Sequence, residues 1–102
     1  MKIVYICSPL RGDIYGNTMR AIGYCKQAVQ RGLIPIAPHV YCQNFLDDAL
    51  PEERAMGMRI GIELLKFCDA LVICGTRISE GMAAEIAEAK RLKIPVRWWA
   101  GA

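Results

Sequence analysis

Residues 69–99, DALVICGTRISEGMAAEIAEAKRLKIPVRWW, decide the fold of this chain. The apolar run at 69–75 is typical of a strand that is buried on both faces. After a polar loop, Ser79 is a candidate N-cap for a helix that we expect to end near Leu92. A short apolar run at 94–99 then predicts another strand. A strand, a helix and a second strand in this order imply a right-handed crossover between parallel strands.

The first two thirds of the chain show the same alternation of strands and helices. The run KIVYICS is continuously apolar and rich in β-branched residues, as in a strand that is covered on both faces. The run LIPIAP carries two prolines, which indicates a strand at the edge of a sheet. The predicted strands are 2–8, 33–38, 69–75 and 94–99, and the predicted helices run from Asn17 or Thr18 to about Arg31, from Pro51 to about Phe67 and from Ser79 to Leu92.

This order of elements predicts an α/β fold with a four-stranded parallel sheet, strand order 2-1-3-4, and helices on both faces. With 102 residues and no linker, we expect a single domain that spans residues 1–102. A chain this short buries a modest fraction of its surface, so self-association would be a reasonable way to enlarge its core.

Composition excludes several classes of protein. The chain is 54% hydrophobic and 23% charged, and its net charge of +3 comes from scattered basic residues, which argues against a nucleic-acid-binding protein. No apolar run approaches the roughly 20 residues that cross a bilayer, and the N-terminus lacks the pattern of a signal peptide. The five cysteines are odd in number and lack the close spacing of a zinc or redox site. We therefore expect a cytoplasmic protein without a metal.

Chemistry is expected where the strand order reverses. In open parallel sheets, ligands bind beyond the carboxyl ends of the strands at that point, which lies here between the first and third strands. Three segments that are rich in polar residues converge on it: CSPLRGDIYGN at 7–17, PHVYCQNFLDD at 38–48 and GTRISEGMAAE at 75–85.

The first of these segments could bind an anion. Ser8, Arg11 and Gly12 combine a hydroxyl, a guanidinium and a permissive backbone close to a helix start, which suits a phosphate. The segment matches neither the Walker A pattern nor GxGxxG. An ordinary turn with a solvated arginine is an equally good interpretation of these residues.

The last helix places a carboxylate beside its apolar stripe. At about 100° per residue, Met82, Ile86 and Ala89 form the inward stripe, and Glu85 lies at its flank one turn into the helix. The helix dipole would help to keep that carboxylate ionised, as a nucleophile or base requires. A surface glutamate paired with Lys90 is the alternative.

Two further residues could support the site, and two could form an interface. Tyr5 on the first strand needs a hydrogen-bond partner if it is buried, and a carboxylate at the strand ends would serve. His39 is the only histidine and is more often a structural hydrogen-bonding residue than a catalyst. Trp98 and Trp99 fit either a subunit interface or the core beside the last strand.

Three segments together resemble the nucleoside 2-deoxyribosyltransferase-like superfamily. YICSPLRG is similar to the opening strand and loop of its deoxynucleoside 5'-monophosphate N-glycosidases, CDALVICG to its third strand, and SEGMAAEIAEA to its nucleophile helix. Within the superfamily, the chain is most similar to small phage and bacterial domains of unknown function. The resemblance implies a flavodoxin-like three-layer α/β sandwich, a homodimer or larger homo-oligomer, and no metal or organic cofactor.

The resemblance also implies roles for single residues. By position, Glu85 matches the nucleophilic glutamate that attacks the anomeric carbon, and Tyr5 matches the tyrosine that positions it. A small-molecule nucleoside or nucleotide is the implied partner. The candidate substrate-binding residues are Ser8, Arg11, Gly12, Ser79, Gly81 and His39.

One position departs from the superfamily pattern. In the superfamily, an aspartate near the position of Gly61 helps to protonate the leaving base. This chain has no aspartate there, so the acid would have to come from His39, Asp47 or Asp48.

The leading hypothesis from the resemblance is cleavage or transfer at the N-glycosidic bond of a (deoxy)nucleoside or its 5'-monophosphate. The alternative is a nucleotide- or nucleotide-sugar-binding module without catalysis. A protein-interaction role for the RWW segment is a third possibility.

Overall fold

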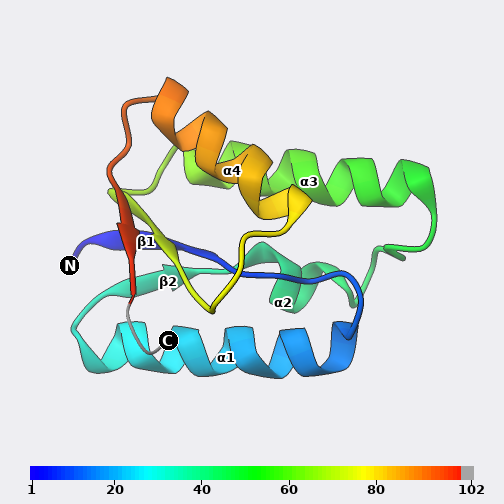
Figure 1. Cartoon of the computed structure of the whole chain (residues 1–102), viewed down its shortest axis with the longest axis horizontal. Coiled ribbons are helices and arrows are strands. Elements are labelled where there is room, and N and C mark those ends of the chain that lie inside the picture. The colour runs from blue at the N-terminus through cyan, green and yellow to red at the C-terminus, as the bar shows by residue number, and fades with distance from the viewer. Residues whose placement is uncertain (100–102) are drawn as a thin grey trace.

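The computed structural model describes residues 1–99 and shows a parallel sheet between two layers of helices (Figure 1). The strand order is β2-β1-β3-β4, and every pair of neighbouring strands is parallel, so the predicted α/β fold and strand order are confirmed. The elements are β1 (Ile3–Cys7), α1 (Ile14–Gln30), β2 (Ile34–Ile36), α2 (Pro38–Cys42), α3 (Pro51–Leu65), β3 (Ala70–Ile73), α4 (Glu80–Arg91) and β4 (Val96–Trp98).

The two faces of the sheet are covered by different helices. Helix α1 lies along one face, and α3 and α4 lie along the other (Figure 1). Side chains of β1 alternate between these faces, since successive residues of a strand point to opposite sides. Val4 and Ile6 join the core cluster on the α1 side, whereas Tyr5 and Cys7 join the cluster on the side of α3 and α4.

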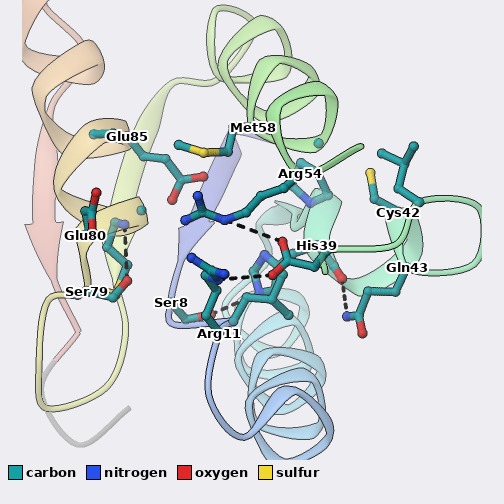
Figure 2. Close-up of a pocket in the computed structure, with 18 of the residues that line it drawn as sticks. Ser8, Arg11, His39, Cys42, Gln43, Arg54, Met58, Ser79, Glu80 and Glu85 are labelled. Carbon is teal, nitrogen blue, oxygen red and sulfur yellow. Dashed lines mark hydrogen bonds and ion pairs between the residues drawn. The ribbon is translucent and has the colours of Figure 1, made fainter. Parts of the chain in front are cut away.

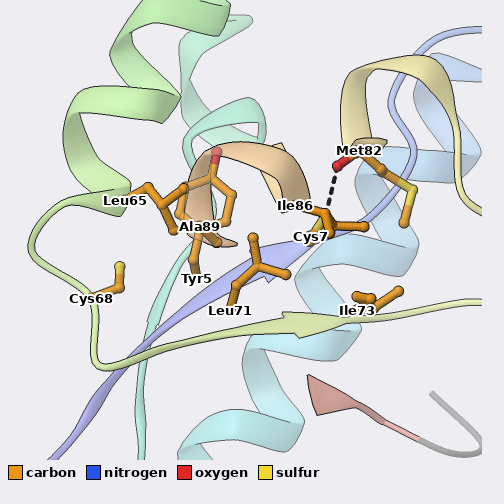
Figure 3. Packing of buried hydrophobic residues seen from close by; sticks show 9 residues of the cluster. All are labelled: Tyr5, Cys7, Leu65, Cys68, Leu71, Ile73, Met82, Ile86 and Ala89. Atoms are coloured by element: carbon orange, nitrogen blue, oxygen red, sulfur yellow. Dashed lines mark hydrogen bonds between the residues drawn. The ribbon is translucent and has the colours of Figure 1, made fainter. Parts of the chain in front are cut away.

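The core on the side of α3 and α4 carries the chemistry described below. Figure 3 shows Tyr5 and Cys7 beside Leu71 and Ile73 of β3, under the α4 residues Met82, Ile86 and Ala89. All three α4 residues are buried, which confirms the inward stripe that the helical spacing predicted. This packing holds the first turn of α4 against the carboxyl end of β1.

Helix α1 starts earlier than we predicted. Asp13, and not Asn17 or Thr18, is its N-cap, and the Asp13 side chain accepts a hydrogen bond from the Gly16 N–H at 3.0 Å. Asn17 lies buried inside the first turn, where its amide donates to the carbonyl oxygens of Leu10 and Arg11 at 3.0 and 3.1 Å. This amide ties the loop after β1 to α1.

The C-terminal tryptophans have different environments. Trp99 is buried in the α1-side core, where the Arg31 guanidinium lies 4.3 Å from its ring centroid. Trp98 at the end of β4 is 55% exposed. Of the two alternatives, packing in the core therefore holds for Trp99. The ring of Trp98 is accessible to a partner. No helix in the described part of the chain is long and apolar enough to cross a membrane.

Candidate functional site

A cavity of about 420 Å³ opens at the carboxyl ends of the strands, within the size range of small-molecule sites. Figure 2 shows side chains from the loop after β1, from α2, from α3 and from the start of α4 pointing into it. The structure brings all eight residues selected from the sequence to its wall: Tyr5, Ser8, Arg11, Gly12, His39, Ser79, Gly81 and Glu85.

The Glu85 carboxylate is held by two donors from β1. The Tyr5 hydroxyl donates a hydrogen bond to Glu85 Oε2, and the Cys7 thiol lies 3.5 Å from Glu85 Oε1 as a second donor. Tyr5 and Cys7 are two residues apart on one strand, so both side chains point to the same face of the sheet. Each carboxylate oxygen therefore has its own partner, and the carboxylate is fixed in the cavity wall.

Burial sets the electrostatics of this group. Burial raises the pKa of Glu85 from its ordinary value of 4.5 to about 7, although the hydrogen bonds from Tyr5 and Cys7 act in the opposite direction. Burial and the nearby Glu85 charge both raise the pKa of Tyr5 and of Cys7, so these groups stay protonated and keep donating. The result is a carboxylate that changes its charge near neutral pH, as is common for catalytic groups.

Ser8 and His39 form a neutral pair in the cavity wall. The Ser8 hydroxyl lies 3.3 Å from His39 Nε2, and Ser8 is buried. Burial lowers the pKa of His39 to about 4, so its imidazole is uncharged at neutral pH. The pair can orient a polar substrate group by hydrogen bonding without adding charge.

Asp48 joins two arginines into a charge cluster. Arg11 Nε lies 3.4 Å from Asp48 Oδ2, and Arg54 Nε of α3 lies 3.9 Å from Asp48 Oδ1. Two guanidiniums and one carboxylate give this cluster a net positive charge. Asp47, in contrast, is exposed and accepts a hydrogen bond from the Ala49 N–H in a turn.

The start of α4 contributes the Ser79 hydroxyl and the backbone of Gly81 to the cavity wall. Ser79 is the N-cap of α4, as predicted, and its Oγ accepts a hydrogen bond from the Met82 N–H at 3.3 Å. A hydroxyl that accepts one hydrogen bond can still donate another, so capping leaves Ser79 able to contact a ligand. In the loop between β1 and α1, Gly12 has a φ of +94°, a conformation that favours glycine.

Residues 1–99 contain no group of three or more His, Cys, Asp or Glu side chains that could hold a metal ion. The cavity instead offers one perturbed carboxylate, a positively charged cluster and several hydroxyls. That set is suited to covalent chemistry on a substrate that carries a phosphate or other anion.

A family model described as "Domain of unknown function (DUF7768)" matches residues 2–99. The chain belongs to this family. No curated protein matches the sequence.

A solved structure shares the fold of this DUF7768 domain. It is the 2-deoxyribosyltransferase of the psychrotolerant bacterium Bacillus psychrosaccharolyticus, with a TM-score of 0.70 and 18% sequence identity. The match covers 94% of this chain and 70% of the other. The expected likeness in fold to nucleoside 2-deoxyribosyltransferases is therefore confirmed.

Several residues of the site were not among those selected from the sequence. Cys7 is buried in the core, and its position two residues after Tyr5 is a signal that both side chains reach the same partner. Arg54 and Met58 of α3 line the cavity (Figure 2). Nothing in their sequence surroundings distinguishes them from residues on an exposed helix face, because α3 has a weak apolar pattern.

Proposed function

We propose that this DUF7768 domain cleaves or transfers the N-glycosidic bond of a (deoxy)nucleoside or its 5'-monophosphate, with Glu85 as the nucleophile. One observation carries the proposal: the Glu85 carboxylate lies in the wall of a ligand-sized cavity, with its two oxygens held by Tyr5 and Cys7. A solved protein with the same fold is a 2-deoxyribosyltransferase, which supports glycosyl transfer as the class of reaction.

In this mechanism, a Glu85 oxygen forms a bond to the anomeric carbon while the bond from that carbon to the base breaks. The electron pair of the broken bond leaves with the base, and a covalent glycosyl-enzyme results. The transition state has oxocarbenium character, so the adjacent carboxylate stabilises its positive charge. Attack by water on the glycosyl-enzyme gives hydrolysis, and attack by a second base gives transfer.

The rest of the cavity wall would hold the sugar and its phosphate. Arg11 and Ser8 follow β1, and Ser79 and Gly81 lie at the start of α4, so two loops contribute to one cavity wall. A guanidinium, two hydroxyls and the N-terminus of a twelve-residue helix are suited to a phosphate group. His39 would contact the sugar as a neutral hydrogen-bonding partner.

The test is release of free base. The purified protein is incubated with each of the four deoxynucleosides and their 5'-monophosphates, and free base is measured by chromatography. We expect release by the wild type and a loss of at least about 1000-fold for Glu85→Ala, because the nucleophile is gone. Glu88→Gln, which removes an outward-facing carboxylate of the same helix, is the matched control. Equal near-zero rates for wild type and Glu85→Ala on every substrate would refute the proposal.

A non-catalytic nucleotide- or nucleotide-sugar-binding module is the second candidate. The observation in its favour is Gly61, which stands where the superfamily pattern has an acid for the leaving base. Thermal denaturation with added nucleotide separates the two candidates, since any ligand that binds the folded state raises the melting temperature. Stabilisation without base release favours the binding module.

We also propose that the domain forms a homo-oligomer. Helix α1 exposes Tyr15, Met19, Ile22 and Val29, which follow one another at helical spacing on its outer side, and Trp98 is exposed on β4. Light scattering at known protein concentration tests this, and a monomer at all concentrations up to about 100 μM, well above the Kd of a typical stable interface, would contradict it.

A further inference from the structure

The position expected to carry an acid is closed to any side chain. Gly61 is buried, and a Cβ atom on it would lie 2.6 Å from the Tyr5 hydroxyl oxygen and 3.5 Å from Glu85 Oε2. A carboxylate at this position would displace Tyr5 from Glu85. Helix α3 therefore cannot protonate the leaving group through residue 61.

The other carboxylates of the cavity wall sit where their negative charge is stabilised. Asp48 lies between the Arg11 and Arg54 guanidiniums. Glu53 and Glu80 occupy the first turns of α3 and α4, at the positive ends of these helices. Glu53 also accepts a hydrogen bond from the Asp47 N–H at 2.8 Å. Asp48 is thus a charge partner and Glu53 an acceptor, whereas Glu80 lies exposed at the start of α4.

The two remaining candidates for an acid are also occupied. His39 is neutral at neutral pH, and its ring nitrogen faces Ser8 at 3.3 Å. The Tyr5 hydroxyl donates its hydrogen bond to Glu85 and stays protonated. Asp48, Glu53, His39 and Tyr5 are thus engaged with neighbouring groups, and the arginines of the described cavity wall are the groups that can stabilise a negatively charged leaving group.

Three arginines line the cavity: Arg11 pairs with Asp48 at 3.4 Å, Arg77 is exposed on the loop before α4, and Arg54 extends from α3. The Arg54 side chain is only 28% exposed, and the one ion pair that it makes with a described residue, Asp48, is long at 3.9 Å. Figure 2 shows the guanidinium extending from α3 into the cavity, toward the side on which the Glu85 carboxylate lies. A guanidinium does not give up a proton, but its fork of N–H groups stabilises an adjacent anion.

We infer, as an extension of the proposed function, that Arg54 stabilises the leaving group as an anion. The preferred substrates then carry a base whose departing nitrogen is acidic, such as uracil or thymine. As the bond between the anomeric carbon and N1 breaks, its electron pair stays on N1, and Glu85 bonds to the carbon. The released anion takes its proton from water afterwards. Adenine and guanine, which leave well only after protonation, are poor substrates.

The experiment compares three substrates and four proteins. The substrates are deoxyuridine 5'-monophosphate, its 5-fluoro derivative, whose base is a better anion, and deoxyadenosine 5'-monophosphate. The proteins are wild type, Arg54→Ala, Arg54→Lys and the control Arg59→Ala, which removes an exposed arginine from the same helix. Values of kcat/KM are measured from base release, and melting temperatures show that each variant is folded.

We expect wild type to cleave the fluoro substrate fastest and the adenine substrate slowest. Arg54→Ala should lose about 100-fold on the uracil substrate, the scale of one lost anion-stabilising donor, and clearly less on the fluoro substrate. Arg54→Lys should fall between, and Arg59→Ala should match wild type.

A preference for adenine, or an equal loss on all three substrates in Arg54→Ala, would overturn the inference while the base released by wild type still supports the proposed function. No base release from any substrate would overturn both.

Discussion

Gly61 and Tyr5 lie so close together that a Cβ atom at residue 61 would stand 2.6 Å from the Tyr5 hydroxyl oxygen. The backbone of α3 therefore lies against the phenol, and Glu85 of α4 is close to both, since the same Cβ atom would be 3.5 Å from Glu85 Oε2. Two helices and the first strand meet at this hydroxyl. The contact explains why glycine is suited to a buried helical position that would otherwise favour a residue with a side chain.

Gly61→Ala should disturb the site without unfolding the protein. The new methyl group displaces the Tyr5 hydroxyl from Glu85, and the loss of a hydrogen bond to a charged group, about 1.5–3 kcal/mol, predicts a loss of roughly 10- to 100-fold in kcat/KM. Gly57→Ala is the matched control, since its Cβ would meet Leu46 Cδ1 at 3.6 Å, an ordinary contact. Base release and melting temperature are measured for both. Equal activities in the two variants would contradict the role assigned to this contact.

Tyr5→Phe should shift the pH dependence of activity. The Tyr5 hydrogen bond lowers the pKa of Glu85, so its removal raises that pKa further above about 7. At pH 7 the variant should be much slower than wild type and should recover part of its rate at pH 8–9 as Glu85 ionises. Tyr41→Phe, at an exposed position, is the control. A uniform loss at every pH would mean that Tyr5 does not tune the carboxylate.

Wild-type activity should rise with pH through the neutral range. A nucleophilic carboxylate reacts in its ionised form, and burial places the pKa of Glu85 at about 7. The profile of kcat/KM against pH, which reports the free enzyme, should therefore climb between about pH 6 and pH 8. A profile that is already flat at pH 5 would show that the reactive group is an ordinary exposed carboxylate.

Glu85 and His39 should affect stability in opposite directions as pH changes. Folding raises the pKa of Glu85 from 4.5 to about 7, so the folded state binds the extra proton, and this residue's contribution falls as pH rises through that window. Folding lowers the pKa of His39 from 6.5 to about 4, so its contribution is present above pH 6.5 and is lost as pH falls toward 4.

Substitutions of Glu85 and His39 should therefore change the free energy of unfolding at opposite ends of the pH range. Glu85→Gln should gain on the order of 1–3 kcal/mol over wild type at pH 8, and the gain should vanish near pH 4. His39→Gln should gain relative to wild type near pH 4 and not at pH 8. Urea denaturation at several pH values measures both. A gain for Glu85→Gln that is the same at pH 4 and pH 8 would exclude a raised pKa.

Local patterns predicted the elements better than their exact starts. The continuous apolar runs gave β1 and β3, because a strand that is buried on both faces needs apolar residues at every position. The predicted start of α1 was wrong, because Asp13, Asn17 and Thr18 are all good N-cap residues by type. Only the tertiary contacts of Asn17 with the loop after β1 decide which of them caps the helix.

The candidate site was predictable only in part. Glu85 at the flank of an apolar stripe and Tyr5 in a buried strand are local features, and the resemblance to a superfamily connected them. The place of Arg54 in the cavity was not predictable, because an arginine in the first turns of a mixed helix is most often on the surface.

The sequence by itself determined the order of the strands and of α1, α3 and α4, the parallel sheet and the inward stripe of α4, because these depend on the spacing of apolar residues along the chain. The short helix α2 was not predicted, and its first residue, Pro38, was assigned to the second strand. Only the tertiary structure decided that the Tyr5 hydroxyl meets Glu85, 80 residues further along, with Gly61 behind it. Such a contact depends on how closely α3 and α4 pack on β1. The burial that results from this packing, and not the residue types themselves, gives Glu85 its raised pKa.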